Sequence, residues 1–137
     1  MWLLYALIAA ATAALVAIFG KIGLQGVDST LATTVRGIVM AVVLIVASAI
    51  GGKFSGLSSV SGRAWLFIAL SGLAGATSWL AYFLALKLGP TTHVSAIDRL
   101  SIVFVIVLAA LFLGEAFTWK LALGGLLMIA GAVLIVW

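Results

Sequence analysis

The sequence predicts an all-α integral membrane protein, in which five transmembrane helices are joined by short loops. Of its 137 residues, 66% are hydrophobic and only 7% are charged, whereas a soluble domain is about 45–50% apolar and about 25% charged. The chain also contains five apolar runs of about the 20 residues that a helix needs to cross a bilayer. This composition excludes a soluble enzyme and a disordered tail.

The five predicted spans form a single five-helix domain of residues 1–137 and cover residues 2–20, 30–50, 64–87, 91–113 and 118–137. Each run is continuously apolar and lacks the alternation of barrel strands. Tryptophan residues support these boundaries, because aromatic side chains concentrate at the membrane interfaces. Those at span ends are Trp2, Trp65, Trp119 and Trp137.

The connections between the spans contain helix caps and turn residues. Ser29 or Thr30 is expected to cap the second helix, and Thr91 or Thr92 the fourth. Residues 51–62 are rich in glycine and serine, which predicts a flexible loop.

The formal net charge of +4 comes from seven Lys and Arg residues that are scattered singly, so it does not indicate a nucleic-acid partner. Cysteine is absent, which excludes disulfides and thiolate metal sites. The sequence argues against an enzyme. It has a single histidine, no pair of acidic residues that the spans would bring together, and no phosphate-binding glycine motif. We therefore expect no cofactor and no metal.

Basic residues are nearly balanced between the two membrane sides. The side that holds the N-terminus carries Lys53, Arg63 and Lys120, and the opposite side carries Lys21 and Lys87, with Arg36 not far inside. Because Lys/Arg excess sets orientation, the chain inserts either one way on a weak bias or both ways as an antiparallel pair. Five spans are one half of an inverted-repeat transporter, which a homodimer would complete.

Ionisable residues inside a membrane suggest function or a partnered site. They are Arg36 in the second span and His93, Asp98 and Arg99 in the fourth. With a rise of about 1.5 Å per residue, Arg36 and Asp98 lie about 9–10 Å, and Trp79 about 10–12 Å, from the same side. Sequence neighbours point about 100° apart on a helix, so Asp98 and Arg99 need separate partners.

The pairing we predict joins Asp98 to Arg36, either as a structural ion pair only or as part of a site. Arg99 is then the cation available to a carboxylate. His93 lies in the first turn of its span. It is either an interfacial or capping residue or a proton carrier, and it is also a candidate for substrate binding, as are Asp98 and Arg99.

The third span has a stripe of small and polar residues, which are Ser71, Gly75, Ser78 and Tyr82. Ser71 and Gly75 suit close helix packing, whereas Ser78, Trp79 and Tyr82 are candidates for substrate binding; Trp79 serves either packing or substrate contact. In the fifth span Gly124 and Gly131 share a face, which fits a dimer seam or packing within one subunit.

Several segments carry a family resemblance. They are the ALKLGP turn (Ala85 to Pro90), the polar start of the fourth span, LGE (Leu113 to Glu115), the glycines Gly124, Gly125 and Gly131, FGKIGL (Phe19 to Leu24) and Arg36. In this order they resemble an EamA domain of the drug/metabolite transporter superfamily. The resemblance covers essentially the whole chain, and residues 82–137 resemble the second half of the domain.

The resemblance implies a secondary transporter of small metabolites, often an exporter, in the cytoplasmic membrane. The chain is similar to the single-domain, five-span group. In ten-span relatives, helices one, three and four of each half line the cavity, which supports Trp79, Tyr82, Asp98 and Arg99 and weakens Arg36 as a direct contact. Small multidrug resistance proteins have an essential acid in span one; this chain has none there, so their proton-coupled mechanism is not expected.

Two other functions remain open. One is an auxiliary membrane subunit, or half of a heteromeric lipid-carrier flippase, acting with a different partner. The other is a passive channel.

Overall fold

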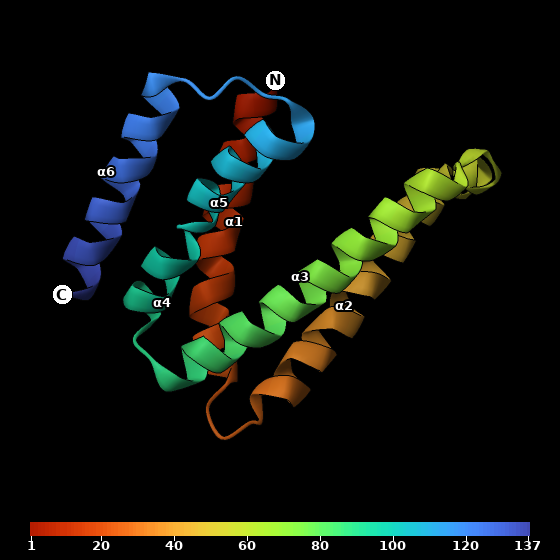
Figure 1. The fold of residues 1–137 in the computed structure, drawn as a ribbon. Coiled ribbons are helices and arrows are strands. Elements are labelled where there is room, and N and C mark those ends of the chain that lie inside the picture. Colours follow the sequence, from red (N-terminus) through yellow and green to blue (C-terminus); the bar gives the residue numbers. More distant parts are fainter. The chain divides into compact units, whose positions relative to one another are not determined.

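The computed structural model describes all residues from 1 to 137, and it contains helices and their connections but no strands. Its elements are α1 (Trp2–Gly23), α2 (Ser29–Ile50), η1 (Lys53–Ser59), α3 (Gly62–Leu88), α4 (Thr91–Asp98), α5 (Ser101–Leu108), η2 (Ala109–Leu113) and α6 (Trp119–Val136) (Figure 1). Five helical stretches are long and apolar enough to cross a membrane. The predicted fold class is therefore confirmed, but the fourth span consists of three shorter pieces.

Two of the predicted helix caps are wrong. Asp28, not Ser29 or Thr30, caps α2, because its carboxylate accepts hydrogen bonds from the backbone N–H groups of Thr30 at 2.9 Å and Leu31 at 3.0 Å. Aspartate is among the preferred N-cap residues, and Ser29 already lies within the helix. Pro90 occupies the N-cap of α4 and supplies no side-chain hydrogen bond.

The connection predicted as a flexible loop is a 3₁₀ helix, η1. Gly52 precedes it with φ at 61°, in the left-handed region that glycine favours. Two serine hydroxyls reinforce the turns by donating to backbone carbonyls, Ser55 to Gly52 and Ser59 to Gly56. The side chain of Ser61 then accepts from the N–H of Ala64 and starts α3.

The chain forms two compact units. One contains Met1–Ile18 and Leu88–Trp137, and the other contains Phe19–Lys87. In the first, α6 packs against α4 and α5, and Ala132 is buried. In the second, the buried side chains are Leu24, Phe83 and Leu86 together with Ser29.

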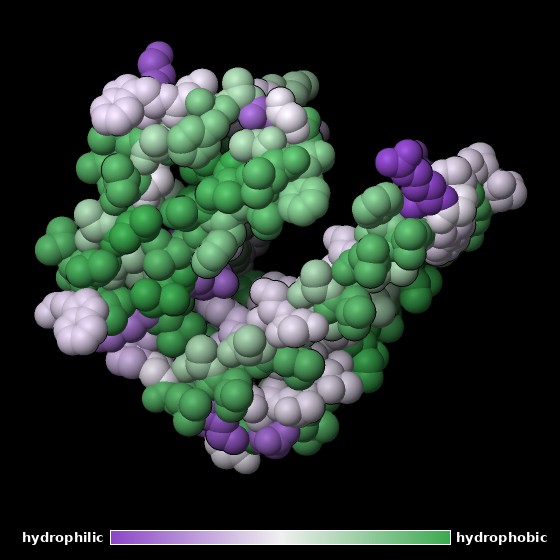
Figure 2. All heavy atoms as spheres, viewed as in Figure 1, coloured by the Kyte–Doolittle hydropathy of each residue, from purple (hydrophilic) through white to green (hydrophobic).

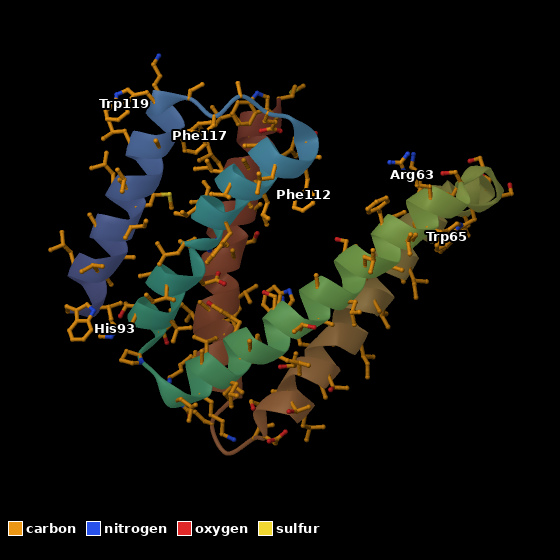
Figure 3. All side chains as sticks on the ribbon, viewed as in Figure 1. Arg63, Trp65, His93, Phe112, Phe117 and Trp119 are labelled. Atoms are coloured by element: carbon orange, nitrogen blue, oxygen red, sulfur yellow. The ribbon has the colours of Figure 1, made fainter.

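Few apolar side chains are buried, and most lie on the helix surfaces. Figure 2 shows a face that is largely hydrophobic, with hydrophilic residues in a few separate spots. Soluble proteins rarely expose apolar patches of this extent, whereas helices in contact with lipid require them. The tryptophans that are expected at the membrane interfaces also fit this arrangement. Trp65 and Trp119 lie at the beginnings of α3 and α6 (Figure 3).

Candidate functional site

Arg36 on α2 stacks on Trp79 of α3, within the unit Phe19–Lys87. The guanidinium carbon of Arg36 lies 3.4 Å from the centroid of the Trp79 ring and 5.5 Å from that of Phe83. These are cation–π contacts, which are stronger where water is excluded. This contact agrees with the similar depths that helical rise predicts for Arg36 and Trp79.

Trp79, Tyr82 and Phe83 form an aromatic cluster on α3. The Trp79 and Tyr82 rings meet edge to face, with centroids 5.8 Å apart and planes at 81°. Phe83 lies 6.0 Å from Trp79 and 6.3 Å from Tyr82, and it is buried. Phe83 is not among the predicted site residues, although it follows Trp79 by four residues and so shares its helix face.

A pocket of about 660 Å³ opens between α2 and α3, and both Arg36 and Trp79 line it. Small residues make the space: a Cβ atom placed on Gly37, Gly72 or Gly75 would meet no other atom within 4 Å. The rest of the wall consists of Thr33, Thr34, Met40, Ala41, Leu44, Ala76 and Leu80. Ser78, predicted as a substrate contact, is exposed and does not belong to this wall.

The fourth span is interrupted where Asp98 and Arg99 stand. α4 ends at Asp98 and α5 begins at Ser101. Across the break the backbone bonds connect residues three apart, from the N–H of Leu100 to the carbonyl of Ile97 at 3.0 Å and from that of Val103 to Leu100 at 2.9 Å. This is 3₁₀ geometry, which in mid-helix often marks a functional hinge.

The glycines of α6 have different surroundings. A Cβ atom at Gly125 would lie 3.8 Å from Ile106 Cδ1 of α5, so this glycine faces a neighbouring helix of its own unit. A Cβ atom at Gly124 or Gly131 would meet nothing within 4 Å.

The sequence matches the EamA-like transporter family over residues 1–137. The chain belongs to the EamA-like transporter family. A protein of a Sinorhizobium species, named "Uncharacterized transporter in cobO 3'region", is 46% identical over 134 residues, which make up 98% of this chain and 95% of that protein. No solved structure matches this EamA-family chain.

The predicted site residues of this EamA-family protein fall into two groups. Arg36, Trp79 and Tyr82 lie in the unit Phe19–Lys87, while His93, in the first turn of α4 (Figure 3), Asp98 and Arg99 lie in the other. The ion pair between Arg36 and Asp98 stays a prediction. The roles of Ser78, His93 and Arg99 in substrate binding stay predictions as well.

Proposed function

We propose that this EamA-family chain is a secondary transporter, which exports small metabolites across the cytoplasmic membrane by alternating access. Family membership supports transport rather than catalysis. The observation that carries the proposal is the break in the fourth span at Asp98 and Arg99. Many secondary transporters build their substrate and ion sites from discontinuous helices of this kind.

Asp98 and Arg99 are the proposed substrate contacts at the break. Both side chains are exposed, and Arg99 offers a planar fork of N–H donors that matches a carboxylate. Replacing Arg99 by Gln should leave a folded protein that no longer transports. Lys120→Gln, which removes an exposed cation at the start of α6, is the matched control. A folded Arg99→Gln protein with normal transport would remove Arg99 from the site.

The transport test begins with a thermal-shift screen of amino acids, bases, sugars and cationic drugs on the purified protein. Any compound that stabilises the protein is then loaded into proteoliposomes, and its movement is measured against concentration. Alternating access predicts a saturable rate. Flux that rises without saturation would instead indicate a channel, and binding without flux would favour an auxiliary subunit.

The proposed working form is an antiparallel homodimer, because basic residues are nearly balanced between the two sides. The chain has no cysteine, so one introduced cysteine reports topology without background. Ser58→Cys in η1 should react with a membrane-impermeant maleimide in about half of the molecules in intact cells, and in all of them after permeabilisation. Complete or absent labelling in intact cells would show one fixed orientation.

A further inference from the structure

Arg36 carries a charge at membrane depth without a carboxylate close by in its own unit. It lies seven residues after the start of α2, or about 10 Å along the helix axis. The only acidic residue between Phe19 and Lys87 is Asp28, eight residues before Arg36 or about 12 Å along the axis, where its carboxylate caps α2. A charge at such depth is costly unless it is paired.

The stacked geometry leaves the donors of Arg36 available. Its guanidinium contacts are with the faces of Trp79 and Phe83, and a ring stacked on the guanidinium plane leaves the N–H groups pointing outward from its edges. Those edges match the two oxygens of a carboxylate or phosphate. An anion that enters the pocket would therefore neutralise the charge without breaking the cation–π contact.

The pocket wall defines what the anion is attached to. The Thr33 and Thr34 hydroxyls already donate to the carbonyls of Ser29 at 2.7 Å and Thr30 at 2.8 Å, so Arg36 is the one cationic donor that the wall offers to an anion. Met40, Leu44 and Leu80 make the remaining wall apolar. A volume of about 660 Å³ falls within the range of about 300–1,000 Å³ for small-molecule pockets.

From this wall we infer that the pocket between α2 and α3 binds a monoanion on an apolar body, with Arg36 receiving its carboxylate or phosphate. The ligand is either an organic acid from water or the head of an anionic lipid. This inference goes beyond the proposed function, because binding here does not require transport.

Binding is measured on the full chain with Trp79 as the only indole, after Trp2, Trp65, Trp119 and Trp137 are replaced by Phe. The probe is octanoate, titrated against protein in phosphatidylcholine nanodiscs while Trp79 fluorescence is recorded. Octanoate should bind at least about tenfold more tightly than the neutral octanamide, because only the carboxylate makes a charge-assisted pair. Arg36→Gln should weaken octanoate binding by a similar factor, and Arg36→Lys by less.

A steric variant tests the pocket without touching the charge. Gly72→Leu adds a side chain into open space, so the protein should fold and lose octanoate binding. Gly23→Leu on α1 also meets open space, lies outside the pocket and should bind normally. Equal affinity for octanoate and octanamide, or unchanged binding in Gly72→Leu, would overturn the inference even if Arg36→Gln fails to fold.

Nanodiscs that contain phosphatidylglycerol separate the two sources of the anion. Weaker octanoate binding in these discs, seen in the parent protein but absent in Arg36→Gln, identifies a lipid phosphate as the occupant. Unchanged octanoate binding identifies a soluble organic acid. If Arg36→Gln responds to phosphatidylglycerol as the parent does, the lipid acts elsewhere and is not the occupant.

Discussion

The Lys21 ammonium of α1 donates a hydrogen bond to the backbone carbonyl of Leu86 in the last turn of α3. Lys87 makes the reciprocal contact, since its Nζ lies 3.1 Å from the carbonyl oxygen of Val27 after α1. A cation near a helix C-terminus also interacts favourably with the helix dipole. These two hydrogen bonds thus join the end of α1 to the end of α3.

Removing the Lys21 contact should destabilise the protein. Lys21→Met leaves the Leu86 carbonyl without its charged donor, so the free energy of unfolding should fall by about 1.5–3 kcal/mol. Thermal and denaturant unfolding in detergent measure this, with Lys120→Met as a control for the loss of a lysine. Equal effects of the two variants would show that the hydrogen bond contributes nothing.

Gly20 should not tolerate a methyl group. A Cβ atom at Gly20 would lie 3.2 Å from Cζ of the buried Phe83, so Gly20→Ala should cost about 1–3 kcal/mol through overpacking. Gly23→Ala on the same helix meets open space and should be neutral or stabilising, because alanine favours helix. If Gly20→Ala and Gly23→Ala unfolded at the same temperature, the close contact between residue 20 and the Phe83 ring would be contradicted.

The Asp28 cap should make stability depend on acid pH. The N–H of Leu31 above all, with that of Thr30, holds the pKa of Asp28 below its ordinary value of 3.8. A lowered pKa gives stability that is present above the ordinary value and is lost as pH falls through the lowered one. Asp28→Asn caps without titrating, so only the parent should lose this increment below about pH 4. If the free energy of unfolding of the parent and of Asp28→Asn depended on pH in the same way, the Asp28 cap would not be the source of the loss in acid.

The predicted pair between Arg36 and Asp98 can be separated from the stacking on Trp79 by a double-mutant cycle. If the pair exists, Arg36→Gln and Asp98→Asn should each cost about 3–5 kcal/mol, and the double variant should cost less than their sum. Additive effects would exclude the pair. A second cycle of Arg36→Gln with Trp79→Leu should show coupling in either case, because the two side chains are in contact.

Gly124 and Gly131 should matter for assembly, whereas Gly125 should matter for folding. Leu at Gly124 or Gly131 enters open space in one subunit, so the monomer should fold and dimer cross-linking should decrease. Leu at Gly125 collides with α5 and should destabilise the subunit itself. Unchanged dimer cross-linking in Gly124→Leu and Gly131→Leu would place the seam on another face.

Hydropathy and helical rise predict much of the fold and part of the site. The third predicted span, 64–87, corresponds to α3 from Gly62 to Leu88. Arg36 and Trp79 are predicted at similar depths because each lies a similar number of residues from the end of its span on the same side. The break after Asp98 has no proline or glycine to signal it, so the sequence predicts one uninterrupted helix at this place. The contact of Gly20 with Phe83 depends on how α1 packs on α3, which no local pattern encodes.

The 3₁₀ turn in the fourth span also restricts its surroundings. Because the N–H of Leu100 bonds to Ile97 and that of Ile102 to Arg99, the carbonyls of Ala96 and Asp98 receive no hydrogen bond from the N–H four residues later. Hydrocarbon offers no donor to an exposed carbonyl, and leaving one bare there costs several kcal/mol. This turn must therefore be in contact with water or with other protein groups, and it cannot face the acyl chains of the lipids.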